Sequence, residues 1–399
     1  MSTLSPFPLA ELVVPAFFII AAGFVITWVV TRSVIQSLFL PFIKAAVFLI
    51  YYTVFFDGTW TFLDDWNYLE QGEALLAQGV SVTNFWTSLP ALFSAAGGQH
   101  VVYYLFNADA ARLFGPAYYA PVALNIVLTF VAAALMAGAA RNGLHVSRRL
   151  ATGLFVLLVL SPTLIAWSTV MNGKDTIVMT GTAMAAYAVS QAERGHYRRA
   201  VLLGLAVGFV LFFTRFYTPL MMLSALGGAI LLSHAGRRSP WLWLLAISGL
   251  GGVLSLLGIG GLTSALSRLQ DGFVNPLYGF IRYLLTPIPF GATESYSFLN
   301  LPQVLYWLLL PCMGYGIYRV WQRATLTGRF IVIYFFLMVA LYAMFGILQG
   351  PRHRYQLEGL IVVFQFLGLL SVIQQMGFRR LTSNLFTPSS TTDVAATIT

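Results

Sequence analysis

The 399-residue chain has few charged residues and almost no cysteine. Only 9% of its residues are Asp, Glu, Lys or Arg, whereas a soluble domain carries roughly a quarter. With 58% apolar residues and a mean hydropathy of +0.80, the chain has too few hydrophilic side chains to cover a soluble surface. The single Cys312 lies in an apolar run and excludes both an internal disulfide and a metal site built from several thiolates.

Long apolar runs dominate what is present. A spanning helix needs about 20 mostly apolar residues, and charged or Pro/Gly clusters divide the sequence into about eleven such runs. The predicted spans are 9–31, 38–56, 116–140, 151–171, 174–191, 200–214, 217–233, 241–260, 302–318, 330–348 and 355–375. We therefore expect an all-α polytopic membrane protein: one transmembrane domain over 1–380 and a disordered cytoplasmic tail over 381–399.

The basic residues indicate the orientation, because cytoplasmic loops are enriched in Lys and Arg. One set of short loops and adjoining span ends holds 15 of the 22 basic residues: Arg32, Lys44, Arg141, Arg148, Arg149, Arg194, Arg198, Arg199, Arg237, Arg238, Arg319, Arg323, Arg329, Arg379 and Arg380. On this prediction 11 of the 13 acidic residues lie on the outer side. The net charge of +9 then reflects topology, and we expect no binding of nucleic acid.

Seven basic residues lie on the predicted outer side, against this rule. They are Arg112, Lys174, Arg215, Arg268, Arg282, Arg352 and Arg354. Basic side chains near a membrane surface need an anionic partner, either an outer carboxylate or a phosphate group. For Arg215, Arg352 and Arg354 we favour the phosphate.

The longest polar stretch, residues 57–115, is predicted to be an outer loop with short interfacial helices. One helix is expected from Asp64 to Gln78 with Gly79 as its stop, and a second over His100–Leu113. Adjacent acids at a helix start suit its dipole, but a carboxylate pair near lipid also favours a general base or a metal ligand. His100 is either a ligand or proton carrier, or an isolated loop residue.

A tight outer turn contains Lys174 and Asp175. The two side chains either neutralise each other, or Asp175 joins Asp64 and Asp65 in a three-carboxylate site. Such a site, with His100, would supply ligands for a divalent cation, although no ligand spacing demands one and no cofactor is otherwise indicated.

These segments, taken in order, resemble the integral membrane GT-C glycosyltransferases, in particular the bacterial branch with aminoarabinose transferases and protein mannosyltransferase-like enzymes. The matching segments are Leu63-Asp64-Asp65-Trp66-Asn67-Tyr68 through Gly79, His100-Val101-Val102-Tyr103-Tyr104 through Gly115, Ser161-Pro162, Asp175, Arg215 within Phe213-Thr214-Arg215-Phe216-Tyr217, and Arg352-His353-Arg354-Tyr355. The chain departs from the family in having two predicted spans before the acidic loop and no soluble outer domain.

The resemblance implies a glycosyltransferase of a bacterial inner membrane, with its active site on the periplasmic side. It would move a sugar from a polyprenyl-phosphate donor to a lipid, glycan or protein acceptor. Asp64 or Asp65 would act as base with Asp175 in support, and Arg215, Arg352 and Arg354 would hold the phosphate. The expected substrate-binding residues also include Tyr68, His100, Lys174, Tyr355 and, if its loop is a lid rather than a plain connection, Arg282.

Three other functions fit parts of the pattern. A polysaccharide polymerase or ligase of the O-antigen type also uses outer-side arginines, but it does not need an acidic first loop. A lipid-linked glycan transporter would favour charges near the bilayer midplane and repeated halves, and neither is evident. A structural membrane subunit would leave the outer charges without partners.

Overall fold

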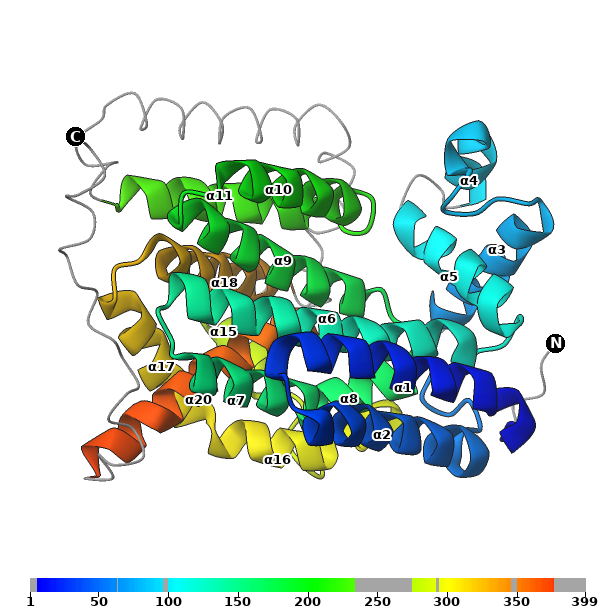
Figure 1. Ribbon diagram of the computed structural model, residues 1–399, viewed down its shortest axis with the longest axis horizontal. Helices are drawn as coiled ribbons and strands as arrows, with labels where there is room; N and C mark the ends of the chain where they lie inside the picture. Colours follow the sequence, from blue (N-terminus) through cyan, green and yellow to red (C-terminus); the bar gives the residue numbers. More distant parts are fainter. Residues whose placement is uncertain are drawn as a thin grey trace.

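The computed structural model describes residues 6–62, 64–95, 100–233, 275–291, 294–345 and 350–376. Within these ranges the chain is helical and contains no β-strand. Most of the helices run roughly along one common direction, and a smaller group, α3 to α5, lies at one end of the bundle (Figure 1). The predicted all-α class is therefore confirmed for the described part of the chain.

Five described helices are long and apolar enough to cross a membrane. They are α1 (Leu9–Thr31), α2 with its π-helical continuation (Val34–Phe55), α6 (Tyr119–Gly143), α18 (Leu326–Met344) and α20 (Glu358–Gln375). A sixth span results if α7 (Arg148–Val159) and α8 (Pro162–Val170), which meet at a 42° bend, are taken together. Pro162 has no backbone N–H to continue α7, so the chain breaks at Ser161-Pro162.

The predicted count of about eleven spans is not confirmed. Four other predicted ranges are helical but shorter or less apolar: α9 (Asp175–Glu193), α10 (Tyr197–Phe212), α11 (Tyr217–Leu231), and the pair α16 (Asn300–Leu308) and α17 (Leu310–Gln322). The range 241–260 lies outside the described residues, as do Arg237, Arg238, Arg268 and the tail 381–399.

Two helices approach with their backbones in contact. A Cβ atom on Gly316 of α17 would overlap the carbonyl of Phe364, and one on Gly368 of α20 would overlap the carbonyl of Cys312. Small residues allow this approach, which is common between membrane helices. Cys312 thus lies at a helix contact, on α17.

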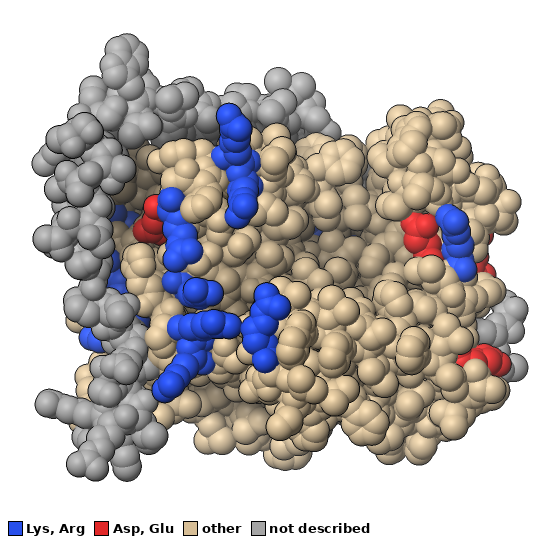
Figure 2. Space-filling view, in the orientation of Figure 1, with Lys and Arg blue, Asp and Glu red and all other residues tan. Residues whose placement is uncertain are grey.

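Charge is distributed unequally between the two ends of the bundle. On the face in Figure 2, Lys and Arg gather toward the left, away from α3 to α5, whereas most Asp and Glu lie at the right. Lys44 differs from its prediction. Because α2 begins at Val34, Lys44 lies midway along the span, buried, with Nζ 2.7 Å from Thr129 Oγ1.

The two helices predicted in the 57–115 loop are present. Helix α3 (Asp64–Ala77) is followed by Gly79 with φ +72°, and α5 (Val101–Phe114) begins after His100, which adopts the left-handed conformation. A third helix, α4 (Leu89–Ala95), lies between them. Helices α3 and α5 pack closely where Gly72 faces Asn107, and this contact fixes the position of the acidic start of α3.

Candidate functional site

Asp175, the first residue of α9, is the centre of a buried cluster. Its side chain is 4% exposed and its Oδ1 accepts from Arg215 Nη2 at 2.7 Å and from Gln356 Nε2 at 2.6 Å. Its Oδ2 accepts from Arg352 Nε at 2.8 Å. Arg215 lies on the turn between α10 and α11, and Arg352 belongs to the short helix α19 (Pro351–Tyr355). One carboxylate therefore joins three distant segments.

Arg352 also reaches the acidic loop. Its Nη1 lies 3.1 Å from Oδ2 of Asp64, the first residue of α3. The Asp64 side chain is 57% exposed, whereas that of Arg352 is 13% exposed. Asp64 is thus the carboxylate of this cluster that a ligand can approach from solvent.

Lys174 lies next to Asp175 but does not pair with it. Its Nζ is 2.6 Å from the Tyr68 hydroxyl and 2.8 Å from His100 Nε2. Within the described residues no carboxylate oxygen lies within 4.0 Å of this amine. Burial and the neighbouring Arg215 lower the pKa of Lys174 to about 6, so the group combines this amine with two guanidinium groups, Arg215 and Arg352, and two carboxylates, Asp64 and Asp175.

His100 is held in one neutral tautomer. Burial and the neighbouring Lys174 lower its pKa to about 4, so the ring is uncharged at neutral pH. Its Nδ1 lies 2.8 Å from the carbonyl oxygen of Thr214, which can only accept. Nδ1 therefore carries the proton, and Nε2 accepts from Lys174.

Asp65 has a different environment from Asp64. It is buried, its Oδ1 accepts from the backbone N–H groups of Phe62 at 3.2 Å and Trp66 at 3.1 Å, and its Oδ2 accepts from the Tyr118 hydroxyl at 2.6 Å. Burial raises the pKa of this carboxyl group. Because both oxygens already have donors, Asp65 fixes the start of α3 and faces the core.

A network of buried amides and phenols supports the turn before Asp175. The Tyr103 hydroxyl donates to Asn172 Oδ1 at 2.5 Å, while Asn172 Nδ2 donates to Asn107 Oδ1 at 2.8 Å and to the Asp65 carbonyl at 3.0 Å. Tyr103, Asn107 and Asn172 were not predicted as site residues. The signal that could have found them is a phenol and two amides in apolar surroundings, because buried polar groups need hydrogen-bond partners.

A second network closes around Arg215. Its Nη1 donates to the Tyr217 hydroxyl at 2.6 Å, which lies 3.2 Å from the Tyr342 hydroxyl. The Tyr342 hydroxyl donates to Gln356 Oε1 at 2.7 Å, and Gln356 Nε2 in turn donates to Asp175 Oδ1. Arg215 Nε is nevertheless buried without a hydrogen-bond partner among the described residues. The sequence analysis did not single out Tyr217, Tyr342 or Gln356.

Three predicted residues lie apart from the cluster. Arg354 is buried and donates to the carbonyls of Leu284 at 3.0 Å and Thr286 at 2.6 Å, so it holds the end of α15 (Pro276–Leu285). Tyr355 stacks on Trp167 at 5.5 Å, with its hydroxyl 3.2 Å from Thr176 Oγ1.

Arg282 is exposed on α15, and it makes no side-chain hydrogen bond or ion pair with any described residue. Its neighbour Tyr283 is buried and donates to the His353 carbonyl at 3.3 Å. Arg282 is therefore not joined to the charged cluster through described contacts.

The three-carboxylate metal site does not fit this geometry. In the part of the chain that the structure describes, no three His, Cys, Asp or Glu side chains are placed to hold one ion. Asp175 is occupied by arginines and Asp65 by N–H and O–H donors, so neither carboxylate presents a free oxygen to the other acids.

Comparisons of the chain with protein-family models, with curated proteins and with solved structures found no match. The side chains of Asp64, Lys174, Asp175, Arg215 and Arg352 together form the charged cluster, whose chemistry indicates what the protein can bind.

Proposed function

We propose that this chain is a membrane glycosyltransferase of the GT-C type that transfers a sugar from a polyprenyl phosphate to an acceptor. The observation that carries the proposal is the bridging of Asp64 and Asp175 by Arg352. An exposed carboxylate for the acceptor and buried cations for a phosphate are thereby next to each other. Both groups are needed for glycosyl transfer from a lipid phosphate.

Asp64 is the base in this proposal. Its carboxylate takes the proton of the acceptor hydroxyl as that oxygen attacks the anomeric carbon, and the bond between that carbon and the phosphate oxygen breaks. The polyprenyl phosphate leaves with the bonding electrons. A positioned base of this kind typically contributes 10²–10⁴-fold. Asp65 is excluded from this role because its two oxygens face buried donors.

Lys174 and Arg352 bind the departing phosphate in this proposal. Lys174 has no carboxylate partner among the described residues, and its pKa is lowered to about 6, so a phosphate bound beside it would supply the negative charge that favours its protonated form. Buried cations need a counter-ion, and a phosphate supplies several acceptor oxygens. The unpartnered Nε of Arg215 provides a further donor in the same region. Stabilising the developing charge on the leaving oxygen lowers the barrier.

The proposed location is the outer face of a bacterial inner membrane. The cluster lies with α3 and the acidic residues, at the end away from the Lys and Arg concentration in Figure 2. Because cytoplasmic loops are enriched in basic residues, this distribution supports a periplasmic site.

The binding half of the proposal is tested with polyprenyl phosphate and with the corresponding polyprenol, which lacks the phosphate. Native mass spectrometry of the purified protein should show the phosphate bound and the alcohol bound much more weakly. Lys174→Gln should reduce phosphate binding, because it removes the amine that a bound phosphate would hold protonated but keeps a polar side chain. The matched control is Arg198→Gln, an exposed cation on α10.

Equal binding of the phosphate and the alcohol would contradict the proposal, as would equal losses in Lys174→Gln and Arg198→Gln. Either result would favour a protein whose outer cations serve only its own carboxylates.

A further inference from the structure

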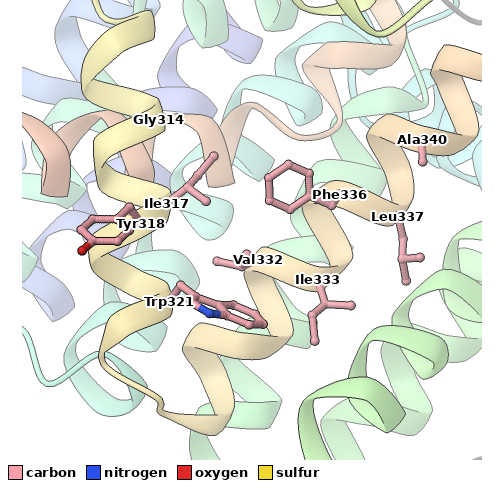
Figure 3. A pocket seen from close by; sticks show the side chains of 9 residues that line it. All are labelled: Gly314, Ile317, Tyr318, Trp321, Val332, Ile333, Phe336, Leu337 and Ala340. Carbon is pink, nitrogen blue, oxygen red and sulfur yellow. The ribbon is translucent and has the colours of Figure 1, made fainter. Parts of the chain in front are cut away.

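An open apolar groove separates α17 from α18, away from the charged cluster. Its volume is about 610 Å³, within the range of roughly 300–1,000 Å³ typical of ligand sites. The lining side chains are drawn in Figure 3: Gly314, Ile317, Tyr318, Trp321, Val332, Ile333, Phe336, Leu337 and Ala340. With Tyr318 and Trp321 as the only lining side chains that carry a polar atom, this lining suits a hydrocarbon chain.

The aromatic rim remains accessible. Tyr318 is 54% exposed, Trp321 42% and Phe336 45%, although α17 and α18 are neighbours. Gly314 leaves open space on its side of the groove, with no atom within 4 Å of the position of a Cβ. An apolar chain can therefore enter without displacing the helices.

A guanidinium without a partner among the described residues, that of Arg329, lies on the same helix face as the groove. Arg329 precedes Ile333, Phe336 and Ala340 at intervals of about one turn, so these residues share one face of α18. Its side chain is half-buried and has no hydrogen bond or ion pair with a described residue. Arg323, by contrast, donates from Nη1 to the Leu144 carbonyl.

The groove and Arg329 lie near the basic end of the bundle. Trp321 is two residues before Arg323, at the connection between α17 and α18. Arg329 lies 13 residues before Tyr342, which belongs to the network around Arg215, and this separation corresponds to about 20 Å along a helix. A phosphate at Arg329 would thus be distinct from one at the charged cluster.

We propose that this groove is a binding site for an anionic phospholipid, with one acyl chain between α17 and α18 and the phosphate at Arg329. Basic pockets at the cytoplasmic ends of membrane helices attract such lipids, and Trp and Tyr favour the headgroup level. On the orientation proposed above, the lipid belongs to the cytoplasmic leaflet. The site does not depend on the glycosyltransferase function.

The test uses native mass spectrometry of the full chain with phosphatidylglycerol or phosphatidylcholine added to the detergent. Phosphatidylglycerol should bind preferentially, and Arg329→Gln should weaken it about five-fold, as expected for one basic residue at an anionic lipid. Gly314→Leu should also reduce binding, because the added side chain enters the open groove. The controls on α10 are Arg198→Gln and Gly204→Leu, since Gly204 also has open space around it.

Several results would overturn the inference. Equal binding of the two lipids, or unchanged phosphatidylglycerol binding in Arg329→Gln, would remove the anionic headgroup from the site. Losses of the same size in the α10 controls would show non-specific adhesion. If added polyprenyl phosphate displaced phosphatidylglycerol from wild type but not from Gly314→Leu, the groove would instead hold the tail of the proposed donor.

Discussion

Two substitutions in the charged cluster, Asp175→Asn and Asp64→Asn, should affect the stability of the protein very differently. Asp175→Asn removes the negative charge that faces Arg215 and Arg352, leaving Arg215 without a carboxylate among the described residues and Arg352 with the exposed Asp64. Breaking a buried pair by removing one partner costs about 3–5 kcal/mol. Since Asp175 serves two arginines, we expect Asp175→Asn to lower the free energy of unfolding by at least the lower end of that range.

Asp64→Asn should behave differently. Asp64 is largely exposed and contacts only one cation, and an exposed ion pair contributes about 0–1 kcal/mol. The predicted difference between the two variants is therefore about 2–5 kcal/mol. The matched control is Asp57→Asn, a carboxylate of the same outer region that accepts from the N–H and the hydroxyl of Thr59.

The assay is thermal unfolding in detergent, followed by a thiol-reactive fluorophore that reports exposure of Cys312, the single cysteine. Asp175→Asn should unfold at a clearly lower temperature than wild type, with Asp64→Asn and Asp57→Asn close to wild type. An Asp175→Asn variant as stable as the Asp57→Asn control would refute the argument that this carboxylate joins the three segments.

Three further outcomes are expected. Asp64→Asn should lower sugar transfer 10²–10⁴-fold, measured as turnover of a lipid-linked sugar by folded protein; normal turnover would remove it as the base. Lowering the pH from 6.5, the ordinary pKa of His, to about 4, the pKa of His100 in the folded protein, should lower the free energy of unfolding. In this range His100 binds a proton in the unfolded chain but not in the folded one. His100→Gln should show a smaller acid loss in the same unfolding assay, and an identical pH profile would contradict this. Gly316→Leu should impair folding through overlap with the Phe364 carbonyl, whereas Gly314→Leu should be tolerated; equal yields of folded protein would refute the close packing of α17 on α20.

Local signals in the sequence were sufficient to predict where the two predicted helices of the outer loop begin and end. Asp64 begins α3, and Gly79 follows its end with a positive φ, as the helix-stop pattern predicted. The outer-side basic residues indicated which cations belong to the cluster but not their partner: a phosphate was favoured for Arg215 and Arg352, and in the structure both pair with the carboxylate of Asp175. These features depend on residue type and short-range spacing, which a single sequence contains.

Tertiary contacts determined what the sequence did not reveal. Whether Asp64 or Asp65 faces solvent depends on packing of Tyr118 against α3, and the sequence pattern left both open as the base. Arg354 has the same residue type as Arg352 two positions earlier, but backbone carbonyls occupy its donors. The partners of Lys174 come from Tyr68 and His100, which are far away in the chain.

The number of membrane spans also could not be predicted from the hydropathy pattern. Composition marks apolar segments, but α7 and α8 form one bent path, and α16 and α17 divide a segment that reads as one run. Lys44 shows the same limit: a basic residue predicted for the cytoplasmic side lies midway along α2 because the helix begins earlier than the hydropathy window.

Mass spectrometry of the lipids that co-purify with the protein shows whether it binds a lipid-phosphate sugar donor. Wild type, Asp64→Asn and Asp57→Asn would be purified in parallel and their bound lipids extracted. We expect a polyprenyl phosphate or its sugar conjugate in all three preparations, with the sugar conjugate accumulating only in Asp64→Asn. Ordinary phospholipid alone in all three preparations would contradict a lipid-phosphate glycosyltransferase.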